Sequence, residues 1–140
     1  MPRSEPMPMP PKLASLDHLV LTVADLDATL AFYSTVLGMR PVPFDPDAAK
    51  PRWALHFGTQ KINLHLKGAE IEPKSDHPTP GSGDLCFLSS APLSDWQGHL
   101  QAQGVRVLDG PVPRTGATGP LISLYIRDPD GNLIEIATPA

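Results

Sequence analysis

The stretch SLYIRDPDGNLIEIATPA, residues 123–140, decides the fold because it predicts two strands joined by a tight turn. The turn reads DPDGN, in which Pro129 fixes one corner and Gly131 can supply a positive φ angle. Counting across this loop places Tyr125 opposite Glu135 in an antiparallel pair. The C-terminal end of the chain therefore predicts a β-hairpin with one carboxylate in the middle of an apolar strand.

The two faces of this predicted hairpin differ in chemistry. Side chains alternate between the faces of a strand, so Leu124, Ile134 and Ile136 share one face. The other face carries Ser123, Tyr125, Glu135 and Ala137. A carboxylate in a buried strand is unfavourable unless a cation, a metal ion or several hydrogen bonds meet it. The polar face is therefore the candidate functional site.

Composition narrows the classes of function. The chain has 140 residues, enough for one domain or two fused half-size modules, and a net charge of -4. No basic stripe favours nucleic acid, and no apolar run reaches the roughly 18 residues of a membrane helix. The N-terminus lacks a secretory signal pattern, so we expect a soluble cytoplasmic protein without nucleic-acid or membrane partners. The single cysteine, Cys86, excludes a disulfide framework and a multi-cysteine zinc cluster, so any metal site must use His, Asp and Glu.

The first half of the chain predicts one compact module. Residues 1–13 are rich in proline and are expected to form a flexible tail. Residues 14–67 predict a strand, a helix with Asp25 as its N-cap, a further strand and a hairpin built from RWALHFG and KINLHLKG. If Phe57 lies opposite Ile62 in this hairpin, Ala54 lies opposite His65. The apolar side chains of the hairpin then face the helix, and the opposite face is polar; it carries His56, Asn63 and His65.

The second half repeats this pattern after a linker. Residues 68–83 are rich in Gly, Pro, Ser and charge and predict a connection between two modules. Residues 84–140 then predict strand, helix, strand and the C-terminal hairpin, with a strand over VRVLDG and a loop over PVPRTGATGP. In this repeat His18 corresponds to Asp84, and His65 is expected to correspond to Glu135.

Two pieces of the chain carry a family resemblance. LDHLVLTVADLDATLAFYSTVLGM (16–39) and YIRDPDGNLIEI (125–136) resemble the vicinal oxygen chelate superfamily, which includes glyoxalase I, fosfomycin- and bleomycin-resistance proteins and extradiol dioxygenases. The resemblance covers residues 16–138. It implies an α+β fold in which two tandem βαβββ modules form a curled mixed sheet of half-barrels around a central metal cavity, with the helices on the outer face.

The resemblance also implies a metal site. The first and last strands of each module would hold one divalent ion, which by position gives His18, His65 and Glu135 as ligands. Asp84 stands in the fourth position, where many active members have His or Glu. It is expected to be a ligand or to accept a hydrogen bond from one, and the alternative is a residue that only caps the strand after Gly83. Two imidazoles and one carboxylate suit Zn, Ni, Mn or Fe.

Two further polar residues are candidates for contact with a substrate. Tyr125, opposite Glu135, is expected to orient the substrate or the carboxylate, and the alternative is an aromatic side chain that only packs across the strands. His56 is expected to carry a proton or support a ligand, and the alternative is a histidine that faces solvent. Cys86 has no activating cation in sight and is expected to be a small buried side chain.

The resemblance implies a small-molecule enzyme. A glyoxalase I-like lyase or isomerase would act on a small substrate with two neighbouring oxygens, or on its thiol adduct, with Glu135 as the base and Asp84 as the other candidate. An Fe(II) dioxygenase and a metal-free drug-binding resistance protein are the alternatives. Open half-barrels leave sheet edges that need a partner, so we expect a homodimer, with the site within one chain or across the interface.

Overall fold

The computed structural model describes residues 9–45 and 51–140. Residues 9–17, which include the described part of the predicted tail (9–13), contain no helix or strand, and residues 1–8 lie outside the described part. The described chain forms two modules of the same element order. The first contains β1 (His18–Val23), α1 (Leu26–Thr35), β2 (Arg40–Phe44), β3 (Arg52–Phe57) and β4 (Gln60–Leu66). The second contains β5 (Asp84–Leu88), α2 (Leu93–Ala102), β6 (Asp109–Thr115), β7 (Pro120–Arg127) and β8 (Leu133–Pro139).

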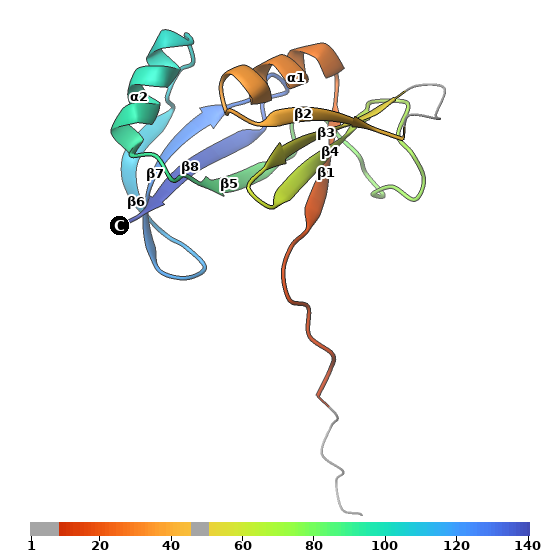
Figure 1. Ribbon diagram of the computed structural model, residues 1–140, viewed down its shortest axis with the longest axis horizontal. Helices are drawn as coiled ribbons and strands as arrows, with labels where there is room; N and C mark the ends of the chain where they lie inside the picture. Colours follow the sequence, from red (N-terminus) through yellow and green to blue (C-terminus); the bar gives the residue numbers. More distant parts are fainter. Residues whose placement is uncertain (1–8, 46–50) are drawn as a thin grey trace, which may run out of the picture.

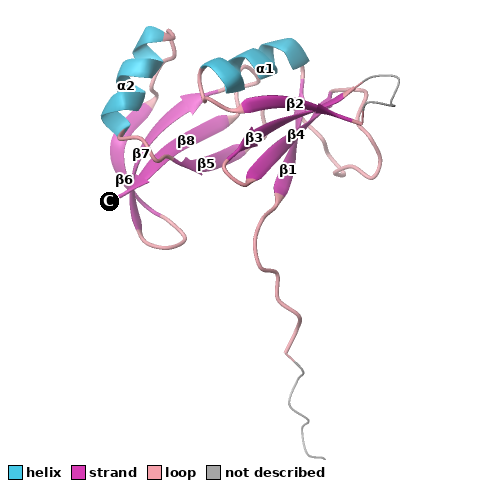
Figure 2. Cartoon of the chain, in the orientation of Figure 1, coloured by secondary structure: helices cyan, strands magenta, loops and turns pink. Residues whose placement is uncertain are grey.

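Each module builds its own four-stranded mixed sheet. The strand order is β1-β4-β3-β2 in the first sheet and β5-β8-β7-β6 in the second. In both sheets the first and last strands of the module run parallel, and the other neighbours are antiparallel. Figure 2 shows the two sheets side by side. This architecture confirms the predicted α+β fold of tandem βαβββ modules.

The helices cover one side of the sheets, as Figure 1 shows. Helix α1 begins where predicted, because the side chain of Asp25 accepts a hydrogen bond of 2.9 Å from the backbone N–H of Ala28. Buried side chains from both sheets and both helices then form one hydrophobic core, in which Leu55, Leu100 and Leu124 are fully buried. Neither helix of the described chain is long and apolar enough to cross a membrane.

The turn of the C-terminal hairpin ties the two modules together. The buried carboxylate of Asp128 accepts a hydrogen bond of 2.7 Å from the hydroxyl of Tyr33 on α1 and another of 2.7 Å from the side-chain amide of Asn132. Asn132 in turn accepts a hydrogen bond of 2.7 Å from the backbone N–H of Gly83, at the entrance to β5. Asp130 accepts one of 3.2 Å from the N–H of Ala24. The DPDGN sequence is therefore both a turn and the polar junction between the modules.

Two sequence predictions about the strands were wrong. In the β3–β4 hairpin Phe57 pairs with Gln60 rather than with Ile62, so the turn has two residues and the register moves by two. In the second module β6 covers Asp109–Thr115, so only the last two residues of the predicted strand VRVLDG are strand, and β6 takes the first half of the predicted loop PVPRTGATGP. Proline is tolerated there because β6 is an edge strand, where missing N–H donors leave no neighbour unpaired, and because the pairing with β7 is interrupted by a bulge after Asp109.

Candidate functional site

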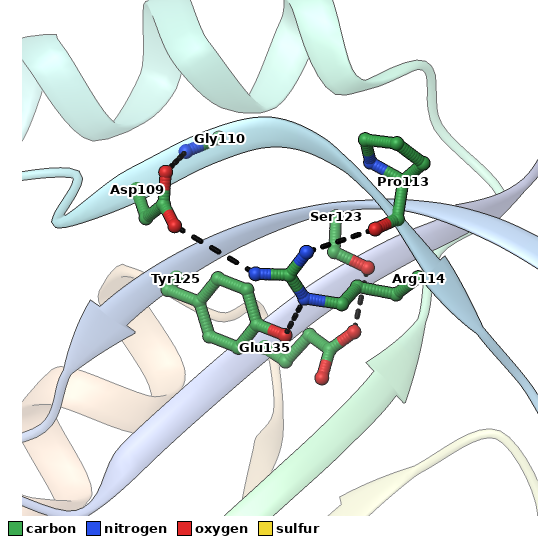
Figure 3. A network of polar contacts seen from close by, with 7 residues as sticks. All are labelled: Asp109, Gly110, Pro113, Arg114, Ser123, Tyr125 and Glu135. Carbon is green, nitrogen blue, oxygen red and sulfur yellow. Dashed lines mark hydrogen bonds and ion pairs between the residues drawn. The ribbon is translucent and has the colours of Figure 1, made fainter.

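The carboxylate of Glu135 lies on the face of the second sheet opposite the helices. Glu135 is half-buried on β8 and pairs with Tyr125 of β7, as the sequence predicted, and with Cys86 of β5. The hydroxyl of the buried Ser123 donates a short hydrogen bond of 2.6 Å to Oε2 of this carboxylate (Figure 3). A charge-assisted bond of this length fixes the orientation of the carboxylate.

A second polar group stands beside Glu135 on the same face. Nε of Arg114 on β6 donates a hydrogen bond of 2.8 Å to the hydroxyl of Tyr125, and the Arg114 guanidinium lies 3.7 Å from the carboxylate of Asp109 (Figure 3). Because the Tyr125 oxygen accepts from Arg114, its own proton is free to be donated elsewhere. Tyr125 was predicted from the sequence as a site residue, but Arg114 was missed because the segment that carries it was predicted to be a loop.

Cys86 does not behave as the sequence predicted. The expectation of a buried side chain was wrong, because Cys86 is exposed at the edge strand β5. Partial burial of the thiol, followed by the charge of Glu135 and a hydrogen bond with it, raises the pKa of Cys86 to about 11. The thiol therefore stays protonated near neutral pH and is a weak nucleophile.

The pairing of the parallel strands in each sheet shows which residue of the first module corresponds to Glu135. Glu135 pairs with Cys86 across the parallel strands β5 and β8. In the first module the same place opposite β1 is taken by Asn63, which pairs with Val20. The predicted correspondence of His65 to Glu135 is therefore wrong by two residues. The sequence could have indicated that Asn63 corresponds to Glu135, because the two segments share a pattern. Each has one polar side chain between two buried apolar ones: Ile62-Asn63-Leu64 and Ile134-Glu135-Ile136.

Asn63 has an unusual environment for a polar side chain. It is only 6% exposed, and its Oδ1 atom has no hydrogen-bond partner among the described residues. Its neighbours across the strands, Ala54 and Val20, offer no donor side chain. A buried amide oxygen without a partner is costly, so this atom is a candidate ligand for a cation or a substrate hydroxyl.

The two predicted histidine ligands lie at opposite ends of the first sheet. His18 begins β1 and pairs with Lys61, whereas His65 pairs with Thr22, four residues further along the same strand pair. At the usual rise of a strand this separates them by about 13 Å. Within the described residues the structure does not gather three or more His, Cys, Asp or Glu side chains into a group that could hold a metal ion. His18, His65 and Glu135 are therefore not brought together within one chain.

The remaining predicted site residues take different surroundings. His18 is exposed, and its Nδ1 lies 2.8 Å from the carboxylate of Asp17. Asp84 is exposed at the start of β5, two residues from Cys86 on the same face. His56 is half-buried and pairs with Lys61 and with Arg40, so it does not face Asn63 as the predicted hairpin register required.

His65 is buried at the far end of the first sheet. It is 7% exposed. Trp53 of β3 pairs with Leu64 of β4, so the adjacent residues Arg52 and His65 are neighbours across the same two strands. Burial, followed by the positive charge of Arg52, lowers the pKa of His65 below its ordinary value. His65 is therefore neutral at pH 7.

An open cleft lies between the two sheets. It has a volume of about 600 Å³ and runs between the start of β1, the β3–β4 turn and β5; its lining includes Leu16, Leu19, Phe57, Gln60, Leu85 and Cys86. Strands β1 and β5 are both edge strands and do not hydrogen-bond to each other. Val20 on β1 and Leu88 on β5 are exposed, at 45% and 68%. These two edges offer apolar surface and free backbone groups to a further protein segment.

Comparison with known proteins gives consistent relatives. The family model of the Glyoxalase/Bleomycin resistance protein/Dioxygenase superfamily matches residues 15–136. Virulence protein STM3117 of Salmonella typhimurium is 54% identical over 122 residues, which are 87% of this chain and 82% of that protein. Its crystal structure, 51% identical by structural alignment, matches with a TM-score of 0.88 over 92% of this chain and 99% of that chain.

Two further curated relatives extend the comparison. Glyoxalase domain-containing protein RDO1 of Mycosarcoma maydis is 56% identical over 124 residues, which are 89% of this chain and 68% of that protein. Metallothiol transferase FosB of Bacillus licheniformis is 27% identical over 134 residues, with 91% of this chain and 77% of that protein covered. The likeness thus spans both modules and the segment between them.

Proposed function

The chain belongs to the Glyoxalase/Bleomycin resistance protein/Dioxygenase superfamily, and we propose that it is a divalent-metal-dependent lyase or isomerase of the glyoxalase I type. Its substrate would be a small molecule with two neighbouring oxygens, or the thiol adduct of one. One observation carries the proposal. The amide oxygen of Asn63, which has no hydrogen-bond partner among the described residues, and the oriented carboxylate of Glu135 occupy corresponding places in the two modules.

The donor atoms at these places fit a divalent metal ion. His18 and Asn63 lie on one face of the first sheet, with His18 two residues before Val20, the partner of Asn63. On the second sheet Asp84 likewise lies two residues before Cys86, the partner of Glu135, so Asp84 and Glu135 share one face. One imidazole nitrogen, one amide oxygen and two carboxylates suit Zn, Ni, Mn or Fe. We therefore propose these four as ligands, with Asn63 in the role that the sequence analysis gave to His65.

The proposed site needs two copies of the chain. The described residues of one chain form two half-sites, His18 with Asn63 and Asp84 with Glu135, and they do not bring three metal-binding His, Cys, Asp or Glu side chains together. The exposed edges of β1 and β5 support a homodimer in which the first module of one copy faces the second module of the other. Each dimer would then contain two equivalent sites.

The side chains around Glu135 support proton transfer. The bound metal ion would polarise the two substrate oxygens and stabilise negative charge on them. Glu135 would take a proton from the adjacent carbon and return it to the neighbouring one, with Asp84 as the other candidate base. Ser123 holds one oxygen of the Glu135 carboxylate in place through its bond of 2.6 Å. The hydroxyl of Tyr125, held by Arg114, would donate a hydrogen bond to the substrate.

Metal binding tests this proposal directly. Wild-type protein purified without added metal or chelator is analysed for bound metal and then titrated calorimetrically with Zn, Ni, Mn and Fe(II). We expect about one ion per chain, and a loss of affinity of about tenfold or more in Asn63→Leu and Glu135→Gln. His77→Ala is the matched control, because His77 is 90% exposed in the connection between the modules, and it should bind metal like wild type.

The outcomes separate the alternatives. Retained metal in His65→Ala, together with loss in Asn63→Leu, supports the revised ligand set, and the reverse contradicts it. Bound Fe(II) with oxygen uptake on turnover would favour the dioxygenase. Absence of metal binding in wild type under all four titrations would overturn the proposal and favour a metal-free binding protein.

A further inference from the structure

A basic cluster made by Arg52, Lys61 and His65 lies on the first sheet, away from Glu135. The guanidinium carbon of Arg52 and the ammonium nitrogen of Lys61 each lie 4.6 Å from the centre of the Phe44 ring. Arg52 and His65 are cross-strand neighbours, next to the pairing of Trp53 with Leu64. The charges of Arg52 and Lys61 therefore meet at one aromatic ring, and the neutral His65 lies beside Arg52.

One hydrogen-bond donor in this cluster lacks an acceptor among the described residues. Nε of Arg52 is buried and has no hydrogen-bond partner among the described residues. The guanidinium makes one ion pair there, with the exposed carboxylate of Asp45, at 3.4 Å. His65 is 93% buried, since 7% of its surface is exposed, and it makes no hydrogen bond within the described chain. A buried donor of a charged group is rarely left unpaired, so Nε of Arg52 points to an acceptor that the described residues do not supply, and His65 lies beside it.

A small cavity adjoins these donors. It has a volume of about 110 Å³ at the end of the β3–β4 pair and is lined by Arg52 and His65 together with apolar residues, which include Leu26, Trp53, Leu64 and Ile71. Because a water molecule takes about 30 Å³ in the liquid, this space fits only a few heavy atoms. A lining of two polar side chains and several apolar ones suits an anionic head with a short alkyl chain.

We propose that Arg52 and His65 bind the carboxylate of a small aliphatic carboxylic acid. The planar fork of an arginine matches the two oxygens of a carboxylate, and its Nε–H would gain the acceptor that it lacks. A ring N–H of His65 would donate to the same group. The short alkyl chain would contact Trp53 and its apolar neighbours. This site does not include Glu135, and its His65 lies two residues from Asn63 on the same face of β4. Its ligands are different from those of the metal site proposed above.

Propionate is the probe, and propionamide is its neutral counterpart of the same shape. Binding to wild-type protein is followed at constant ionic strength by the indole N–H signals in an NMR spectrum. The chain has two tryptophans, so Trp96, which lies on α2 away from the cavity, serves as an internal control for Trp53. We expect saturable shifts of the Trp53 signal with a Kd on the order of 1 mM, and no response to propionamide.

Substitutions then locate the site. Arg52→Lys keeps the charge and removes the planar fork, and His65→Gln keeps a donor of similar size; each should weaken propionate binding by about tenfold. Arg40→Gln, an exposed basic residue on the neighbouring strand β2, is the matched control and should bind like wild type. Glu135→Gln should also keep propionate binding, so this proposal and the metal site fail separately.

Three results would overturn the proposal. If propionate causes no saturable shift of the Trp53 signal in wild-type protein, the acceptor for Arg52 is a bridging water molecule and not a carboxylate. Equal weakening in Arg40→Gln would mean that propionate responds only to surface charge. Tighter binding of inorganic phosphate than of propionate at the same Trp53 signal would replace the carboxylate with another anion. Because the Trp53 measurement uses wild-type protein, an unfolded variant would not decide the question.

Discussion

Replacing Tyr33 with phenylalanine should destabilise the fold by removing one hydrogen bond at the junction of the modules. The Tyr33 side chain is fully buried, and its hydroxyl donates 2.7 Å to the Asp128 carboxylate. Burial and the charge of Asp128 raise the pKa of Tyr33, so the hydroxyl keeps its proton and remains a donor. The change creates almost no cavity, and a hydrogen bond to a charged group contributes about 1.5–3 kcal/mol.

Urea unfolding followed by tryptophan fluorescence measures this loss, and a thermal scan should show a Tm lower by about 5–10 °C. The other tyrosine provides a matched control, since Tyr125 is half-buried and its hydroxyl bonds to the exposed side chain of Arg114. Tyr125→Phe should cost about 0.5 kcal/mol or less. A Tyr33→Phe variant within about 0.5 kcal/mol of wild type would refute the assignment of this bond to the stability of the junction.

Three other properties follow from single residues. The pKa of His65 is lower in the folded chain than in the unfolded chain, so as the pH falls the unfolded chain takes up the proton first. The free energy of unfolding should therefore be highest above about pH 6.5 and should decrease as the pH drops towards the folded pKa. In unfolding titrations, His65→Gln should flatten this decrease. Gly110→Ala should cost about 3 kcal/mol or more in urea unfolding, because Gly110 has a φ of +108° and an added Cβ would clash with the carbonyl oxygen of Ser123. With a pKa of about 11, Cys86 should react with iodoacetamide on the order of 10²-fold more slowly at neutral pH than an ordinary exposed thiol, and Glu135→Gln should speed the reaction; equal rates in the two proteins would contradict the contact.

The C-terminal hairpin shows what sequence reasoning can determine. The loop DPDGN has a defined length, so Tyr125 was placed opposite Glu135 and the pairing was confirmed. The β3–β4 hairpin was misaligned by two residues because its turn consists of Gly58 and Thr59 alone. A shift of two keeps every side chain on its predicted face, so the pattern of apolar residues cannot distinguish the two registers.

The candidate site was mispredicted for a different reason. His65 was matched to Glu135 by counting residues from the first strand of each module, and the amide of Asn63, which occupies that place, was passed over. Arg114 was missed because prolines on either side of it indicated a loop, whereas an edge strand accepts them. Whether the proposed half-sites on the two sheets meet depends on how two copies of the chain assemble. The pattern of residues within one chain does not predict this arrangement.

One measurement tests the two-copy site most directly. A heterodimer of His18→Ala and Glu135→Ala chains, co-expressed with different tags and purified through both, is analysed for bound metal. If each site takes His18 and Asn63 from one copy and Asp84 and Glu135 from the other, one site carries both substitutions and the other carries none. The heterodimer should then bind about half the metal of wild type, while each homodimer binds almost none. A heterodimer as empty as the two homodimers would place every ligand within one chain and contradict this account.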